Sequence, residues 1–312
     1  MAEQTIVMTG ASRGIGATAA RRVLAENPDA HLVVLARPRA RGALQTRESS
    51  TERISTIDAD LLSLTSVRQA AVEVTGRIRR GALPPLGVLG LNAGAQYVTA
   101  TRDSMDGYEA TFAVNVLANH LLLRSFHASG ATGVHAVVTV SDTHFGDLRH
   151  NLGMVPAPQW MYPQVLVRPG AFENPLSPRA GRMAYSTSKL AAIYLVHAWA
   201  RRCAESWSIQ SFNPGFVPST GLGRDAGPAA RFALRYVLPV LTLSPLATTQ
   251  QRAGQLFKNA LVGDVSGPSG AYIDRDHITS SSAESYDVGR EDELWEVMES
   301  LTAPFLAEDS DL

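Results

Sequence analysis

A glycine-rich turn between an apolar run and a helix-forming run constrains the fold of this chain more than any other stretch. Residues 4–8 (QTIVM) are apolar and β-branched, which is typical of a buried strand in a parallel sheet. TGASRGIG follows at 9–16, and the Ala- and Leu-rich residues 17–26 favour a helix. In such a turn the first glycine permits the bend, the second lets a diphosphate approach the backbone and the third lets the helix pack against the strand; here they are Gly10, Gly14 and Gly16.

This stretch predicts a dinucleotide site in which the amino end of the helix faces the phosphates. A sharp strand-to-helix turn without any ligand is the alternative interpretation, because a glycine pattern alone is weak evidence. The rest of the chain decides between the two.

Composition fits one large α/β domain spanning residues 1–312. Hydrophobic residues make up 45% and charged residues 18%, which is enough for a sizeable core. The net charge of −1, without a block of like charges, predicts no nucleic-acid partner. One cysteine, Cys203, allows no internal disulfide and no cysteine-built metal site, and no metal is expected. The first strand begins close to Met1 and no long apolar run follows, so we expect a cytoplasmic protein without a membrane span.

Strand-like and helix-like runs alternate along most of the chain, which predicts a doubly wound parallel sheet of about seven strands with helices on both faces. After 4–8, the expected strands are 30–36, 54–59, 86–91, 135–140, 209–212 and 271–273, and the expected long helices are 64–80, 105–129 and 183–206.

Two irregular stretches interrupt the alternation. Residues 145–182 contain six prolines, and residues 216–246 mix apolar and aromatic side chains. Long irregular inserts within a domain are usually binding loops or lids, so we expect the first to be a lid and the second a substrate-binding excursion.

The residues after the second expected strand predict which dinucleotide binds. An NAD site usually has a carboxylate there for the ribose 2′-hydroxyl, but residues 35–39 are LARPR and include no carboxylate. Arg37, with Arg13 from the glycine turn, could instead bind a 2′-phosphate, so NADP(H) is favoured over NAD(H). Asp60 is placed to meet the adenine, and Asn92-Ala93-Gly94 ends the strand where the nicotinamide half would lie.

Tyr185 and Lys189 are four residues apart and share a face of the predicted helix, which we expect Tyr185 to open. A free phenol has a pKa near ~10 and is a poor acid or base at neutral pH. An adjacent ammonium and a nicotinamide cation would lower the pKa of Tyr185. The alternative is a partly buried tyrosine beside a lysine with no chemical role.

In this order along the chain, the motifs resemble those of the short-chain dehydrogenase/reductase family: TGASRGIG, Asp60-Leu61, Asn92-Ala93-Gly94, Asn115-Val116, a serine after the fifth strand, Tyr185 with Lys189, and Asn213-Pro214-Gly215. The resemblance implies a Rossmann-type fold and a catalytic group of Asn115, Ser141, Tyr185 and Lys189. Tyr185 would exchange a proton with the substrate oxygen, Ser141 would hold that oxygen, Lys189 would bind the nicotinamide ribose and Asn115 would fix a relay water. The implied cofactor contacts are Thr9, Gly10, Ser12, Arg13, Gly14, Ile15, Gly16, Arg37, Asp60, Leu61, Asn92, Ala93, Gly94, Tyr185, Lys189, Pro214, Gly215, Val217 and Thr220.

The serine position is ambiguous by one residue, because the family usually has paired small residues with the catalytic serine second. Val140-Ser141-Asp142-Thr143 would then place Asp142 there. Ser141 is favoured, since an ionised carboxylate would repel a developing oxyanion, and Thr143 is a weaker substitute. His144, like His120, is expected to be a packed or surface histidine rather than a catalyst.

The substrate is expected to be a bulky, mostly apolar ketone or aldehyde, because aromatic residues that could line a large cleft occur in both inserts. Phe145, Trp160 and Phe216 are the candidates, with sealing of the inserts onto the domain as the alternative role. Residues 101–123 and the C-terminal residues 269–272 and 294–296 are similar to the retinol dehydrogenase and protochlorophyllide reductase branch. Reduction of a C=C bond and a non-catalytic NADP-binding sensor or scaffold are therefore alternative functions, and both monomer and homo-oligomer remain open.

Overall fold

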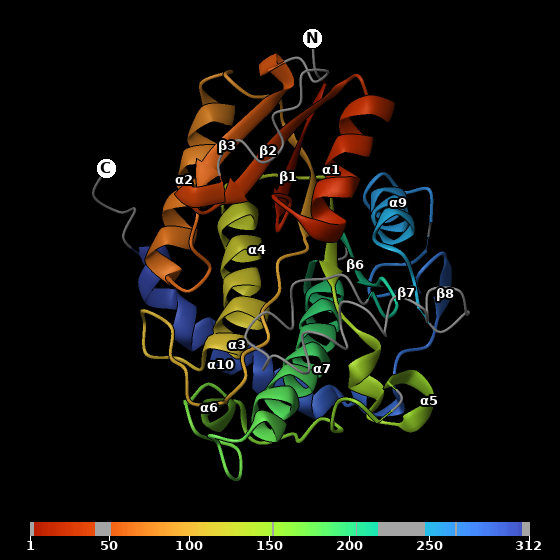
Figure 1. The fold of residues 1–312 in the computed structure, drawn as a ribbon. Helices are drawn as coiled ribbons and strands as arrows, with labels where there is room; N and C mark the ends of the chain where they lie inside the picture. Colours follow the sequence, from red (N-terminus) through yellow and green to blue (C-terminus); the bar gives the residue numbers. More distant parts are fainter. Residues whose placement is uncertain are drawn as a thin grey trace.

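The computed structural model describes residues 3–40, 51–151, 153–203, 205–217, 247–265 and 267–307. Within this part of the chain, eight strands form one sheet in the order β3-β2-β1-β4-β5-β6-β7-β8 (Figure 1). They are β1 (Gln4–Thr9), β2 (Ala30–Ala36), β3 (Ile54–Asp58), β4 (Leu86–Leu91), β5 (Val134–Thr139), β6 (Trp207–Asn213), β7 (Tyr272–Asp274) and β8 (His277–Thr279).

The predicted parallel sheet is confirmed, with one addition at its edge. All neighbours from β3 to β7 pair in parallel, whereas β8 pairs antiparallel with β7. The hairpin between them turns at Arg275, whose φ of 59° lies in the left-handed region. Strand β8 was not predicted from the sequence, because its three residues, His277–Thr279, are all exposed and carry no apolar alternation.

Helices cover both faces of the sheet, as a doubly wound fold requires. On one face, α1 (Gly14–Glu26) packs beside α9 (Gln250–Leu261); α2 (Leu64–Arg79), α4 (Ala118–Ala128) and α7 (Pro178–Cys203) cover the other (Figure 1). Alternate residues of β1 enter separate cores: Val7 joins the α2, α4 and α7 side, while Ile6 and Met8 join the α1 and α9 side.

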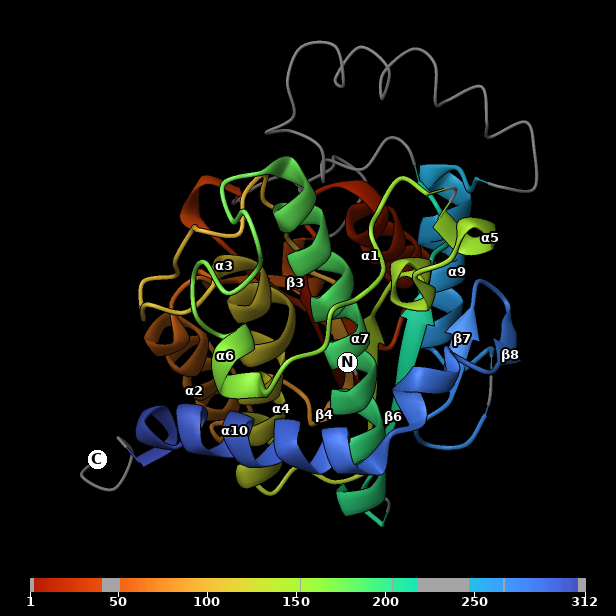
Figure 2. The same cartoon turned by 90° about the horizontal axis from the view of Figure 1, so that it is seen from below.

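The last helix, α10 (Val288–Ala307), lies across the outside of α4 and α7 (Figure 2). No helix was predicted from the sequence for this stretch. In the described residues, no helix is both long and apolar enough to cross a membrane.

Two predicted helices begin at the wrong residue. The helix expected at 105–129 begins at α3 (Ala110–Phe112), because Glu109 caps it by accepting a hydrogen bond from Phe112 N at 2.7 Å. A π-helical stretch, Ala113–Leu117, then leads into α4. Helix α7 begins at Pro178, where proline suits a first turn, so Tyr185 lies in its interior instead of opening it.

The insert at 145–182 is more regular than expected. It contains α5 (Leu148–Asn151), α6 (Pro163–Leu166) and the start of α7. A 3₁₀ turn (Asp142–Phe145) ends at its first residue. Further 3₁₀ turns are Pro38–Ala40, Thr51–Arg53 and Ala283–Tyr286. The predicted excursion at 216–246 lies outside the described residues apart from Phe216 and Val217.

Candidate functional site

The glycine turn is held to the end of β4 by two hydrogen bonds. Thr9 Oγ1 accepts one from Ala93 N at 3.1 Å, and Asn92 Nδ2 donates one to Gly10 O at 3.2 Å. A Cβ at Gly16 would lie 2.3 Å from that same Gly10 oxygen, so only glycine fits there. Because β1 and β4 lie on either side of the point where strand order reverses, this turn borders the crevice in which such sheets bind ligands.

The turn also leaves the amino end of α1 without a side-chain cap. Gly10 and Gly14 have φ of 66° and 59°, values that side chains rarely adopt, and Arg13 precedes the helix without capping it. Uncapped N–H groups at a helix start can bind phosphate oxygens. The residues present therefore fit a dinucleotide diphosphate, with Ser12 and Ile15 in the same turn.

The predicted adenine end gathers residues from three loops. Arg37 is exposed directly after β2, and Asp60 follows β3, where its carboxylate accepts a hydrogen bond from Leu62 N at 3.1 Å. Charges on Arg37 and Asp60 both act on Tyr97, whose phenol pKa is raised chiefly by burial. Arg102 lies over the Tyr97 ring at 4.4 Å. Tyr97 and Arg102 were not predicted from the sequence, because the 95–109 loop has no motif that places it here.

Asn115 is held from three sides at the π-helical stretch. Its Oδ1 accepts a hydrogen bond from Ala95 N at 2.8 Å, and its Nδ2 donates to Ala95 O at 3.0 Å and to Ser188 Oγ at 2.9 Å. Asn119 Nδ2 donates to the Asn115 carbonyl at 2.8 Å. A π-helical turn frequently marks a functional position, and this one fixes the Asn115 side chain between the β4 loop and α7.

Tyr185 and Lys189 are buried side by side on α7, with exposed fractions of 6% and 3%. Lys189 Nζ donates to Thr139 O at 2.9 Å and lies 5.7 Å from the centre of the Tyr185 ring. A Cβ at Gly94 would lie 3.4 Å from both Asn115 Oδ1 and Lys189 Nζ. The structure therefore brings together the strand-end motif of β4, Asn115 and the Tyr185–Lys189 pair.

Burial dominates the titration of this pair. It raises the pKa of Tyr185 to about 12 and lowers the pKa of Lys189 to about 8. The lowered phenol pKa expected from the sequence is therefore not found in the protein alone, because desolvation outweighs any help from the ammonium. A phenol with such a pKa is protonated at neutral pH and can donate its proton.

Of the three candidates after β5, Ser141 is the one whose side chain faces the phenol. Its hydroxyl partly offsets the effect of burial on the pKa of Tyr185. Asp142 instead neighbours Asn213 and Asp274, and burial together with the Asp274 charge raises its pKa to about 6. The buried Thr143 hydroxyl has no hydrogen-bond partner in the described structure.

The remaining predicted residues lie in different places. Pro214, Gly215 and buried Val217 follow β6 at the same edge of the sheet, whereas Thr220 lies outside the described residues. Leu61 packs against the core on the α2 side. The Phe216 backbone pairs with Ala247.

The two aromatic candidates of the first insert differ. Phe145 follows the Ser141 turn and stacks on His150 at 3.8 Å. Trp160 contacts Tyr194 at 4.8 Å, and Tyr194 is nine residues, about two and a half helical turns, from Tyr185. The structure therefore does not bring Trp160 to the tyrosine hydroxyl, and its packing is that of a side chain sealing the insert onto α7.

Comparisons with known proteins agree with this geometry. The family model described as short chain dehydrogenase matches residues 4–143. The chain is 25% identical over 347 residues to the short-chain dehydrogenase iccH of Talaromyces variabilis, covering 93% of each chain. It is 26% identical over 325 residues to the chloroplastic protochlorophyllide reductase of Pisum sativum, covering 95% of this chain and 77% of that one. The fold is similar to that of the NADPH-bound carbonyl reductase from chicken fatty liver, with a TM-score of 0.59, 17% identity, and coverage of 90% and 100%.

Proposed function

We propose that this chain is a short-chain dehydrogenase/reductase, an oxidoreductase with a nicotinamide cofactor. Its proposed activity is that of an NADP(H)-dependent carbonyl reductase, which also works in reverse as an alcohol dehydrogenase. The observation that carries the proposal is the group of buried Asn115, Tyr185 and Lys189 with half-buried Ser141, beside a glycine turn that fits a diphosphate.

We assign each member of this group a role that its contacts support. Tyr185 is protonated at neutral pH and donates its proton to the carbonyl oxygen of the substrate. Ser141, beside the phenol, hydrogen-bonds that oxygen as negative charge develops on it. Lys189, whose ammonium donates to Thr139 O at the end of β5, would bind the nicotinamide ribose, and Asn115 holds the loop after β4 against α7. Bound NADPH supplies the hydride.

Replacing Tyr185 tests this role directly. Tyr185→Phe should lower kcat for ketone reduction by about 10²- to 10⁴-fold, because the general acid is lost. Tyr108→Phe is the matched control, since Tyr108 packs against the core before α3 and the charge that acts on its phenol is that of Asp106. Steady-state NADPH oxidation measures both variants. A Tyr185→Phe protein as active as wild type would remove the proposal.

Preference for NADP(H) is supported by Arg37, which is exposed after β2 where a carboxylate would serve NAD. Arg37→Ala should raise the KM for NADPH about tenfold or more and leave the KM for NADH unchanged, because only the former has a 2′-phosphate. Arg39→Ala, a neighbouring exposed arginine, is the control. Equal KM values for both cofactors in the wild type would contradict this preference.

A bulky, mostly apolar ketone or aldehyde is the proposed substrate, within a single domain in which 145–182 serves as a lid and 216–246 as a substrate-binding excursion. Phe145, the last residue of the 3₁₀ turn that Ser141 caps, supports an apolar wall near the reacting carbonyl. Turnover of a panel of aromatic, polycyclic and small polar carbonyls tests the idea, and activity confined to the small polar ones would reject it.

Reduction of a C=C bond is a second candidate, because the similarity to protochlorophyllide reductase covers 95% of this chain. Conjugated enones distinguish the two reactions: a carbonyl reductase yields the allylic alcohol and a C=C reductase the saturated ketone. Binding of NADPH without turnover of any substrate would favour a non-catalytic sensor or scaffold.

A further inference from the structure

One short segment between β8 and α10, residues 281–286, contacts two of the three elements that carry the catalytic group: α7 and the turn after β5. On one side, Ser282 N donates a hydrogen bond to His144 Nε2 at 3.1 Å. His144 Nδ1 lies 2.6 Å from the Ser141 carbonyl oxygen. Because Nε2 accepts a hydrogen bond, the proton of the neutral ring is on Nδ1, which therefore donates to Ser141.

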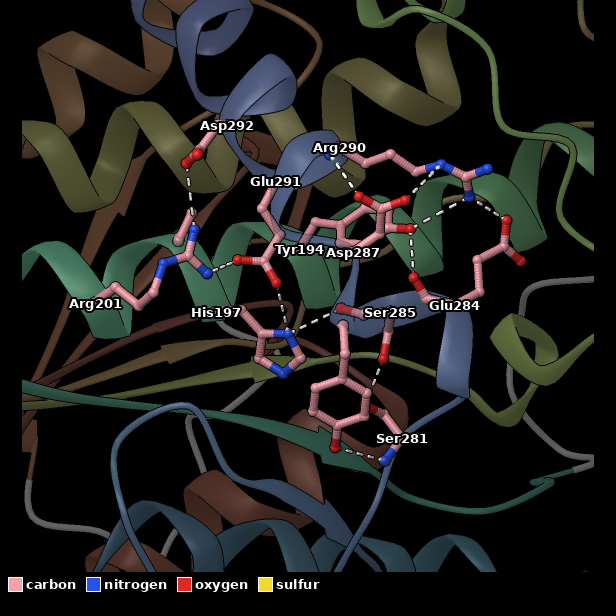
Figure 3. A network of polar contacts seen from close by, with 12 residues as sticks. Tyr194, His197, Arg201, Ser281, Glu284, Ser285, Asp287, Arg290, Glu291 and Asp292 are labelled. Carbon is pink, nitrogen blue, oxygen red and sulfur yellow. Dashed lines mark hydrogen bonds and ion pairs between the residues drawn. The ribbon is translucent and has the colours of Figure 1, made fainter.

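On its other side, the same segment is fastened to α7 (Figure 3). Tyr194 Oη donates to Glu284 O at 2.7 Å, and His197 Nδ1 lies 3.0 Å from Ser285 O. Within the segment, the hydroxyls of Ser281 and Ser285 are 2.6 Å apart, and Ser285 Oγ donates to Ser282 O at 2.7 Å. The segment therefore connects the helix that carries Tyr185 with the turn that carries Ser141.

Ser141 makes a closer contact with this connection than with the backbone of its own turn. Its carbonyl also accepts from His144 N, but at 3.3 Å, and its hydroxyl accepts from Thr143 N at 3.4 Å. The contact with His144 Nδ1 is the shortest of the three. His144 is 1% exposed and packs against Phe145 at 4.1 Å and Tyr272 at 5.2 Å between ring centres, so its ring has a fixed orientation.

We infer that His144 is a positioning residue. Its hydrogen bonds with Ser282 and with the Ser141 carbonyl couple the position of α7 to the Ser141 backbone, and so hold the serine hydroxyl against the Tyr185 phenol. The inference rests on the proposed reductase function, in which Ser141 and Tyr185 act on one substrate oxygen. His144 itself does not touch that oxygen, because both of its ring nitrogens are already paired.

Two pairs of variants separate positioning from packing. His144→Ala removes both hydrogen bonds, whereas His144→Asn keeps an amide that can donate to the Ser141 carbonyl. Ser282→Pro removes the N–H whose hydrogen bond His144 accepts, together with the Ser282 hydroxyl, and the Ser282 φ of −59° already suits proline. Ser282→Ala is its control, because the Ser282 hydroxyl has no partner in the described structure.

We expect kcat for ketone reduction to fall about tenfold or more in His144→Ala and Ser282→Pro, because small misplacements of a catalytic group are costly. The Kd for NADPH should stay within twofold of wild type, since the glycine turn is untouched. His144→Asn should recover most of the kcat lost in His144→Ala, and Ser282→Ala should match wild type. The acidic group in the pH–rate profile should also titrate at higher pH in His144→Ala, since Ser141 would no longer help Tyr185 to ionise.

Histidine nitrogen-15 shifts give a readout that needs no activity. Wild-type His144 should remain the neutral Nδ1–H tautomer from pH 5 to pH 8. A protonated ring at pH 6, or the Nε2–H tautomer, would overturn the inference.

The inference would also be overturned if His144→Ala and Ser282→Pro kept the wild-type kcat and pH profile while Ser141→Ala was inactive. That outcome leaves the reductase function standing. A wild-type enzyme inactive on every carbonyl would reject the function, and the nitrogen shifts would still decide whether the His144 bridge exists.

Discussion

His144 and Asp142 are two residues apart, yet burial shifts their titrations in opposite directions. It lowers the pKa of the His144 imidazole to about 4 and raises the pKa of the Asp142 carboxyl to about 6. In both cases the folded protein favours the neutral form. The charged groups that act on His144 are Asp147, His150 and His197.

Stability should therefore respond to pH through His144. The unfolded chain binds a proton there below about pH 6.5 and the folded protein only near pH 4, so the stability from this group is present above pH 6.5 and is lost as pH falls. Between pH 7 and pH 5 the loss is about 2 kcal/mol, at 1.36 kcal/mol per pH unit. Asp142 acts with the opposite sign, because its raised pKa costs stability as pH rises from 3.8 to 6.

Urea unfolding of wild type and His144→Asn at both pH values isolates the histidine, since Asp142 is common to the two proteins. The stability advantage of wild type over the variant should shrink by about 2 kcal/mol on going from pH 7 to pH 5. An advantage that does not change with pH would show that His144 is not buried in its neutral form.

The chemistry of individual residues was predictable where partners are close in sequence. Tyr185 and Lys189 are one helical turn apart, and their spacing alone placed them on one face. His144 is the opposite case, because its partner Ser282 is 138 residues away and no local pattern links them. The choice between Ser141 and Asp142 needed the backbone of the 3₁₀ turn, which sends the two side chains to different neighbours.

At the scale of elements, the close approach of α7 to the loop after β4 sets the distance between Asn115 and Tyr185. Gly181, one turn before Tyr185, has the Tyr97 and Val98 carbonyl oxygens where its side chain would be; a Cβ would lie 2.4 Å from each. These are backbone atoms and cannot move without shifting the loop.

Gly181→Ala should therefore destabilise the protein by about 1–3 kcal/mol, through overpacking, and lower kcat by moving α7 away from Asn115. Gly76→Ala, in α2, is the matched control: a Cβ there meets the flexible side chain of Arg80, at 3.2 Å from Nη1. That change should be neutral or stabilise by up to about 1 kcal/mol. Denaturant midpoints measure both, and equal midpoints would show that the loop yields to the extra methyl group.

Strand positions were predictable from their apolar runs: the expected 30–36 and 86–91 coincide with β2 and β4. Helix starts were not, because they depend on caps. The side chain of Glu109 starts α3, and Ser177, whose hydroxyl accepts from Ala180 N at 3.2 Å, lies just before α7. The π-helical stretch at Asn115 has no sequence signal of its own, since its contacts come from Ala95 and Ser188.

For the whole molecule, strand order and the carboxyl-edge site follow from the β–α alternation, whereas the position of α10 does not. Its inner residues Leu294, Val297 and Met298 join the core on the α4 and α7 side. Glu299 also reaches α4, where its carboxylate lies 2.9 Å from both His120 Nε2 and Arg124 Nε. A pattern of apolar residues indicates that such a helix is amphipathic, but not which surface it covers.

This arrangement predicts the oligomeric state that the sequence left open. Short-chain dehydrogenase/reductases commonly pair through the helices that carry the catalytic Asn and Tyr. In this chain α10 covers the outside of both α4 and α7 (Figure 2). The outward face of α10 presents Glu293, Glu296 and Ser300, all exposed, which would bring like charges together in a symmetric pair.

Sedimentation velocity at 5 and 50 µM should therefore give one species at the monomer mass of 33.4 kDa. A chain ending at residue 287 should instead self-associate or precipitate, because the apolar surface of α4 and α7 under Leu294 and Met298 would face water. Glu293→Ala with Glu296→Ala serves as the control, since it changes the outer face of α10 and leaves the covered surface intact. A wild-type dimer that dissociates on dilution would mean that pairing uses another face of the molecule and that α10 does not set the oligomeric state.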